Sequence, residues 1–265
     1  MSRARTLALL CGSALLLGCA TWRGGADLPV RHSLVRDQLV IHCDFKLPAH
    51  HRLLDELAAQ RDDVSAKLRL PRSDEPIHVY LFDTAKRFHA FRSAQYPDFP
   101  ARRAFFVETD TRLAVYAHWG DRVAEDLRHE VAHGYLHAVV PHLSLWLDEG
   151  LAEYFEVGRG TGGLNRAHVE TLRRARREAD WKPDLNRLEQ LVSVADMTQL
   201  DYAEAWAWVH LMLESTPPRR EALQQYLNTL RGGGTASSLW ATLRNLQANP
   251  EAAFLRHLES LPAIQ

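Results

Sequence analysis

The pentapeptide HEVAH places two histidines, His129 and His133, four residues apart with Glu130 between them. Four residues make about one turn of an α-helix, so both imidazoles project from one face and the carboxylate of Glu130 lies beside it. Two imidazoles at this spacing are typical zinc ligands, and the intervening glutamate can act as a base toward water that the metal binds. The pentapeptide therefore predicts a metal centre, which needs a third ligand from elsewhere in the chain.

The residues after HEVAH predict a second helix that returns along the first. We expect the first helix to begin after Asp121, which can cap it, and to end near Val139 because Pro141 follows. Ser144 can cap a helix that begins near Leu145, and so short a connection predicts antiparallel helices. This arrangement brings three carboxylates back beside HEVAH, those of Asp148, Glu149 and Glu153.

Together, HEVAH and the segment WLDEGLAEYF (146–155) resemble the gluzincin superfamily, the thermolysin-like peptidases of the peptidase MA group. The likeness is greatest to a branch of short bacterial lipoproteins with a compact peptidase domain. It implies that His129, His133 and Glu149 bind one zinc ion and that Glu130 activates water to hydrolyse a peptide bond. It also implies that Glu153 accepts a hydrogen bond from His129, a contact that fixes the tautomer of the ring.

The sequence departs from the family pattern at two points. Asp148 stands where the family has an asparagine, and we expect it to lie around the ligands together with Glu153. The 15 residues between His133 and Glu149 are fewer than in the large aminopeptidases of the superfamily, a difference that concerns the loop between the helices and not the ligand set. The resemblance covers roughly residues 121–157.

Other ligand sets fit the sequence less well. A metzincin has a third histidine six residues beyond the second, where this chain has Val139. His137 continues the four-residue series, but it lies about 12 Å along the helix axis from His129, too far to share an ion. We expect structural roles for His137 and His142 and solvated positions for Glu125 and Glu156, and Glu153 stays open as an alternative to Glu149.

Hydrolysis of an amide also needs a donor for the oxyanion that develops on the carbonyl. The resemblance implies a tyrosine or histidine from a later helix, and the candidates in LDYAEAWAWVHLMLE (200–214) are Tyr202 and His210. We favour Tyr202, which begins the predicted helix. By analogy with zincins, the strand RLAVYA (112–117) is expected to offer backbone groups to an extended peptide substrate.

Periodicity along the chain predicts an α+β fold, with a small mixed sheet and its helices first and a mainly helical half after it. Strands are expected at 37–45, at 77–82 and in a hairpin formed by RAFFVET and TRLAVYAH, and helices within 48–70 and from 83 to about 95. Helical spacing then covers 122–139, 145–157, 165–179, 186–195, 202–215, 219–231, 236–247 and 250–260. We therefore expect one zincin-like peptidase domain over 37–265, in which 37–157 holds the sheet and the active-site helices and 158–265 is a helical subdomain.

The N-terminal residues predict export and a lipid anchor. Basic residues in MSRAR precede the apolar run TLALLCGSALLLG, which is too short to span a bilayer as a stable helix and is typical of a signal peptide, residues 1–18. The sequence LLGC at its end resembles the lipobox of bacterial lipoproteins, which implies lipidation of Cys19. Residues 19–36 are expected to form a tether. Position 20 is Ala and not the Asp that the lipoprotein pattern associates with retention in the inner membrane, so we expect an anchor in the outer membrane with the protein facing the periplasm.

Composition narrows the choice of partners. The chain of 265 residues carries 32 basic and 33 acidic side chains, so its overall charge predicts no nucleic acid partner. Cys11 is expected to leave with the signal peptide and Cys19 to carry the lipid, so only Cys43 remains as a free cysteine. We therefore expect no disulfide within the mature chain. These features predict a zinc-dependent envelope peptidase with a peptide or protein substrate. Two alternatives stay open: a non-catalytic, metal-stabilised envelope scaffold that binds another protein, and a hydrolase of cell-wall peptides.

Overall fold

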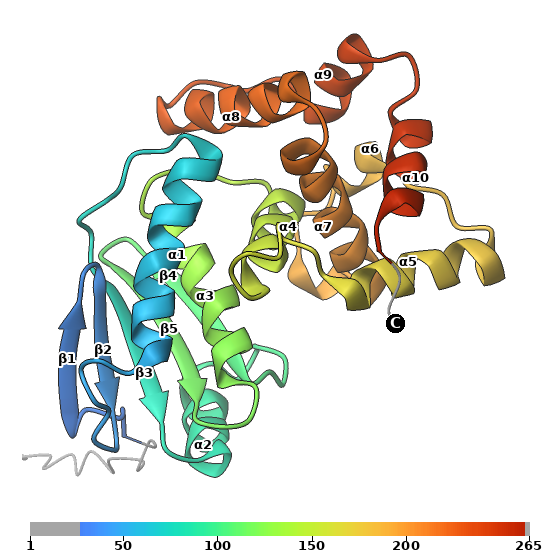
Figure 1. Ribbon diagram of the computed structural model, residues 1–265. Coiled ribbons are helices and arrows are strands. Elements are labelled where there is room, and N and C mark those ends of the chain that lie inside the picture. The colour runs from blue at the N-terminus through green and yellow to red at the C-terminus, as the bar shows by residue number, and fades with distance from the viewer. Residues whose placement is uncertain (1–26, 263–265) are drawn as a thin grey trace, which may run out of the picture.

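The computed structural model describes residues 27–262, which form a mixed α+β fold (Figure 1). The predicted signal peptide, Cys19 and the first part of the predicted tether lie outside these residues. The first half of the described chain contains β1 (His32–Arg36), β2 (Leu39–Cys43), α1 (Arg52–Leu68), β3 (Ile77–Phe82), α2 (Ala85–Gln95), β4 (Ala104–Thr109), β5 (Arg112–His118), α3 (Val123–His137) and α4 (Leu145–Glu156). The second half contains α5 (Arg166–Ala179), α6 (Leu185–Leu188), the 3-10 helix η1 (Val194–Asp196), α7 (Gln199–Glu214), α8 (Pro217–Arg231), α9 (Leu239–Leu246) and α10 (Pro250–Ser260).

The five strands form one mixed sheet in the order β1-β2-β3-β5-β4. β2, β3 and β5 run parallel in its centre, whereas β1 and β4 pair antiparallel at the two edges. Parallel neighbours need a crossover connection, and α1 supplies it between β2 and β3. The predicted hairpin is confirmed as β4 and β5, which leaves β4 as the edge strand on that side of the sheet.

Alternating side chains of the sheet enter two separate clusters. Leu39, Val79 and Val115 face one side and join a large core that includes residues of α1 and α3. The opposite face carries Tyr80 and Tyr116, which pack with phenylalanines of α2. Burying each such side chain contributes roughly 1.5–3 kcal/mol, so helices on both faces stabilise the parallel centre of the sheet.

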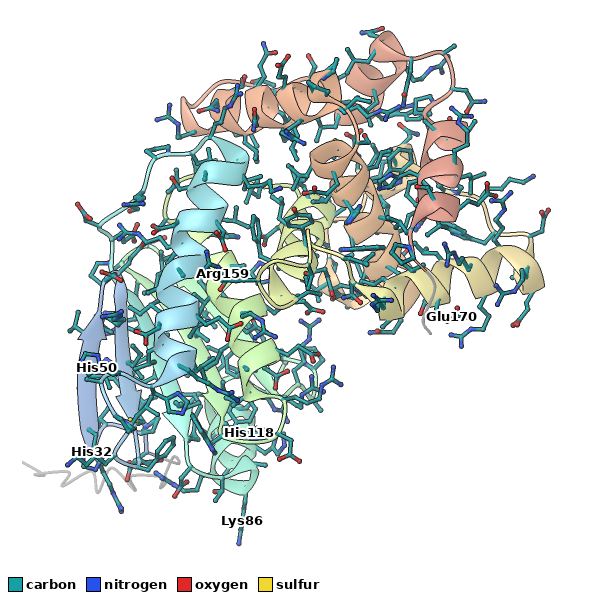
Figure 2. All side chains as sticks on the ribbon, in the orientation of Figure 1. His32, His50, Lys86, His118, Arg159 and Glu170 are labelled. Carbon is teal, nitrogen blue, oxygen red and sulfur yellow. The ribbon has the colours of Figure 1, made fainter. Side chains whose placement is uncertain are left out.

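The second half is built around α7, whose residues from Asp201 to Leu213 are all buried. Thr198 caps this helix, and its side chain and that of Asp201 form a reciprocal capping box. α4 packs on α3 on one side and on α7 on the other, so it connects the sheet half to the helical half. Figure 2 shows His32 of β1 and Glu170 of α5 at opposite ends of the molecule.

Two sequence predictions about elements are wrong. His32–Arg36 were assigned to the tether but form β1, an edge strand whose side chains are mostly exposed and therefore carry a weak hydrophobic pattern. The helix expected over 186–195 is only the four-residue α6 followed by η1, because Val192 is 90% exposed and gives a longer helix no core contact. Among the described residues, no helix has the length and apolar character needed to cross a membrane.

Candidate metal centre

The two helices that carry the candidate ligands lie antiparallel, as the short connection predicted. His129 near the middle of α3 meets Glu156 at the end of α4. Further along α3, His133 meets Glu149 and His137 meets Asp148, so the partners follow one another in reverse order along α4. Their caps differ from the prediction. α3 follows Arg122 and not an Asp121 cap, and Ser144 stands at the N-cap of α4 without a side-chain capping bond.

The three predicted ligands meet at one point between these helices. Nε2 of His129 lies 3.2 Å from Nε2 of His133, and these atoms lie 3.5 and 3.7 Å from Oε2 of Glu149. Tetrahedral bonds of about 2.0–2.1 Å to one ion separate ligand atoms by roughly 3.3–3.4 Å. Two imidazoles and a carboxylate at these distances therefore have the spacing of three ligands around a single zinc ion.

The surroundings of Glu149 support the same conclusion. Its Oε2 is buried and has no hydrogen-bond partner among the described residues, although a buried carboxylate oxygen without a partner is costly. A cation bound between Glu149 and the two imidazoles satisfies that oxygen. The donor set of two nitrogens and one oxygen suits Zn²⁺.

Carboxylates hold the other nitrogen of each imidazole. Nδ1 of His133 donates to Oδ1 of Asp148 at 2.8 Å, as expected for a residue beside the ligands. Nδ1 of His129 lies 3.1 Å from Oε2 of Glu156. A proton on Nδ1 leaves Nε2 free to bind a metal, so both contacts select the tautomer that the site needs.

The predicted role of Glu153 is wrong, and Glu156, predicted to be solvated, takes it. Oε2 of Glu153 lies 2.7 Å from Nε2 of His168 on α5. Burial alone raises the pKa of Glu153, but His168 outweighs it and lowers that pKa to about 2. Glu156 is seven residues after Glu149, two helical turns on the same face, and so comes to lie under His129.

His137 has a structural position, as predicted. Its ring bridges Oδ2 of Asp148 at 2.9 Å and Oε2 of Glu108 at 2.6 Å. His133, His137 and Asp148 could form a second metal group, and so could His129 with Glu153 and Glu156. The contacts of 2.8 and 2.9 Å within the first group are hydrogen-bond distances, shorter than the separation of ligands on one zinc ion.

The predicted base lies in an open cleft next to this centre. Glu130 lines a cavity of about 880 Å³ together with His129 and Tyr202. Burial raises the pKa of Glu130 above its ordinary value, against the opposing charges of His129 and His133. A carboxylate whose pKa is raised accepts a proton more readily than an ordinary one, as a general base must.

Tyr202 lies in this cleft and His210 does not. The hydroxyl of Tyr202 accepts a hydrogen bond of 2.8 Å from Nη2 of Arg102, and burial raises its pKa. His210, the second candidate, is buried elsewhere, with Nδ1 2.8 Å from Nε2 of His257. Burial and the neighbouring His257 lower the pKa of His210 to about 4.

Two features of the cleft were not predicted from the sequence. Arg102 lies before β4, outside any recognisable motif, and only the fold brings it to Tyr202. The strand expected to receive substrate is β5, but both of its edges are already paired, with β3 and with β4. The free edge on that side belongs to β4.

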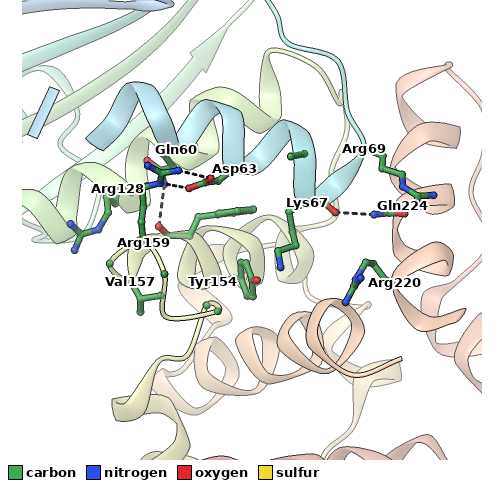
Figure 3. A pocket seen from close by; sticks show the side chains of 16 residues that line it. Gln60, Asp63, Lys67, Arg69, Arg128, Tyr154, Val157, Arg159, Arg220 and Gln224 are labelled. Carbon is green, nitrogen blue, oxygen red and sulfur yellow. Dashed lines mark hydrogen bonds and ion pairs between the residues drawn. The ribbon is translucent and has the colours of Figure 1, made fainter. Parts of the chain in front are cut away.

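A second cavity of about 830 Å³ lies between α1 and the end of α4, beside Arg128 of α3 (Figure 3). On its wall the buried Gln60 of α1 donates to the carbonyl oxygens of Arg128 and Phe155, at 2.8 and 3.2 Å. Gln60 thereby links the residue before His129 to the end of α4. This contact helps to hold the two ligand-bearing helices in register.

A family model described as a protein of unknown function (DUF1570) matches residues 123–232. The matched stretch runs from α3 through α8. It includes the three candidate ligands, Glu130 and Tyr202, whereas the sheet and Arg102 precede it. No curated protein matches the chain.

Proposed function

We propose that this protein is a zinc-dependent metallopeptidase that hydrolyses peptide bonds. The observation that carries the proposal is the convergence of His129, His133 and Glu149, in which Oε2 of Glu149 is buried without a hydrogen-bond partner among the described residues. Three protein ligands leave one zinc position for water or substrate, which is typical of a catalytic site. Glu130 beside an open cleft supports catalysis over a purely structural metal, because a structural site needs no base.

When bound, zinc polarises a carbonyl and lowers the pKa of water toward neutrality. Glu130 takes a proton from the attacking water while the water oxygen forms the new C–O bond, and then gives a proton to the amide nitrogen as the C–N bond breaks. The products are one carboxylate and one amine. Tyr202 accepts a hydrogen bond from Arg102, so its own O–H can donate to the oxygen of the reacting carbonyl.

The test measures zinc content and cleavage of a diverse peptide mixture for the wild type and the Glu130→Gln and Glu149→Ala variants. We expect Glu130→Gln to keep zinc and to lose activity by about 10²–10⁴-fold, and Glu149→Ala to lose zinc. Glu178→Gln, an exposed change on α5, is the matched control and should resemble the wild type. A zinc-loaded wild type that cleaves no peptide would refute the proposal.

The proposal also includes a lipid anchor at Cys19 and a place in the cell envelope, facing the periplasm from the outer membrane. It is supported by the lipobox-like LLGC in the sequence. Mass analysis of the mature N-terminus tests it. A mature chain with an unmodified Cys19 contradicts the anchor without affecting the peptidase proposal.

A further inference from the structure

Arg102 lies two residues before β4 and projects into the cleft that holds Glu130. An arginine presents five N–H donors in a planar fork. Nη2 of Arg102 donates a hydrogen bond of 2.8 Å to the hydroxyl of Tyr202, which fixes one side of the guanidinium. Among the described residues, none of the other donor atoms of Arg102 is buried without a partner, and the side chain lines the open cleft, where a ligand can reach it.

The other arginines that line this cleft are already neutralised. Arg103 makes a bidentate contact with Asp126, in which Nε donates to Oδ2 at 3.0 Å and Nη2 donates to Oδ1 at 2.6 Å. Arg122 binds Glu125, and Arg128 binds Glu56 at 2.9 Å. Within residues 27–262, Arg102 is the one cleft arginine with no carboxylate partner.

The two carboxylates whose charges act on Arg102 already have roles in the proposed mechanism. Burial lowers the pKa of Arg102, but Tyr202 and the charges of Glu149 and Glu130 outweigh it and raise that pKa. Under the proposed function, Glu149 binds zinc and Glu130 serves as the base. Their two negative charges match the charge of a divalent cation, so with zinc bound neither carboxylate is left to neutralise the guanidinium of Arg102 in this partly desolvated cleft.

We propose that Arg102 binds a carboxylate of the substrate, and that peptides with a carboxylate close to the scissile bond are the preferred substrate class. This inference rests on the proposed function. A planar guanidinium recognises a carboxylate through two parallel hydrogen bonds, and Tyr202 fixes its orientation. The carboxylate is either the C-terminal one, which makes the protein an exopeptidase, or the side chain of an aspartate or glutamate.

Matched peptides separate these two sources. One pair differs only in a free or amidated C-terminus, and a second, amidated pair differs only in an internal glutamate or glutamine. We expect the wild type to favour the charged member of one pair by about 10–100-fold in kcat/KM, the range of a charge-assisted contact. The pair that shows the preference identifies the source.

Arg102→Met should abolish this preference by raising KM for the charged peptide, with little change for the neutral one. Arg102→Lys keeps the charge without the fork and should retain part of the preference. Arg103→Met is the matched control, since its guanidinium is held by Asp126, and should keep the preference. An equal loss of turnover on charged and neutral peptides would overturn the proposal, because it would place Arg102 at the reacting carbonyl.

Calorimetric binding to zinc-loaded Glu130→Gln gives a readout that does not need turnover. We expect it to bind the charged peptide about 10–100-fold more tightly than its neutral match, and we expect adding Arg102→Met to remove the difference. Equal affinities for both peptides would refute the role of Arg102 even if the wild type cleaves them. If the wild type cleaves nothing but the affinities differ, the peptidase proposal fails and the carboxylate site stands.

Discussion

At the scale of residues, the neighbours Asp148 and Glu149 carry the same functional group and do different work. The carboxylate of Asp148 bridges His133 and His137. Burial raises its pKa, but the two histidines outweigh burial and hold that pKa well below the usual range. The carboxylate of Glu149 instead lies beside Nε2 of His129 and Nε2 of His133, at 3.5 and 3.7 Å. The partner groups, and not the residue type, thus place Asp148 in support of two rings, and they make Glu149 the metal ligand of the proposed site.

The pairing of His129 leads to a prediction for two glutamates. Glu156→Gln removes the carboxylate that orients the ring and should weaken zinc binding by about 10–100-fold. Glu153→Gln should have a smaller effect, because its main partner is His168. Competition with a chromophoric chelator measures both affinities. A larger loss of zinc affinity in Glu153→Gln than in Glu156→Gln would show that Glu153, and not Glu156, orients the ring of His129.

The candidate ligands could be predicted from the sequence because their meeting depends on local spacing along the chain. His129, Glu130 and His133 share one helical turn, and a short loop brings Glu149 back to them. The choice between Glu153 and Glu156 depends on how α4 is rotated against α3, which side-chain packing decides. Arg102 comes from a segment before β4, and its contact with Tyr202 spans 100 residues, so no local pattern could reveal it.

At the scale of elements, α4 is positioned by close packing against α7. A Cβ atom on Gly150 would lie 2.7 Å from the backbone oxygen of Ala205, closer than real side chains approach. Glycine therefore lets the backbones of α4 and α7 come together directly beside Glu149. The position of Glu149, the third candidate ligand, thus depends on a helix that itself contributes no candidate ligand.

Gly150→Ala should therefore destabilise the protein by about 1–3 kcal/mol and also weaken zinc binding, because α4 has to shift. Gly158→Ala is the control, since a Cβ there meets nothing within 4 Å, and should change stability by less than about 0.5 kcal/mol. Urea unfolding with metal titration measures both effects. Equal stabilities in the two variants would contradict the role of this contact.

Long elements with a sustained apolar face were predicted well, and short ones were not. The segment 250–260 was expected as a helix and is α10 with the same bounds. The helix expected over 186–195 is observed only as α6, where Leu185 and Leu188 are buried for one turn, and the chain then leaves the core. Periodicity predicts a helix only where a partner surface continues along its length.

At the scale of the whole molecule, the buried His210 should make stability depend on pH. Its pKa is lowered to about 4 by burial and His257, from an ordinary value of 6.5. The unfolded chain thus binds a proton there below pH about 6.5, while the folded protein does so only below pH about 4. Stability is fully present above pH 6.5 and is lost by roughly 3 kcal/mol as the pH falls to 4.

Urea unfolding at pH 7 and pH 4.5, with chelator present to remove any contribution of zinc, tests this dependence. His210→Gln has no titrating ring, so its stability should fall less between the two values than that of the wild type, by about 2–3 kcal/mol. Wild type and variant losing equal stability would rule out His210 as the source.

Under the proposed function, the donor atoms of His129, His133 and Glu149 also link the supply of metal to the lifetime of the protein. A ligand that binds only the folded chain stabilises it by mass action, by about 2.7 kcal/mol when its concentration is 100 times Kd. Adding a chelator should therefore lower the melting temperature of the wild type by about 5–10 °C, and leave that of Glu149→Ala unchanged. If the proposed zinc site is correct, a larger fraction of the chains would unfold in surroundings poor in zinc and be open to degradation, so metal scarcity would limit the amount of protein as well as the proposed activity.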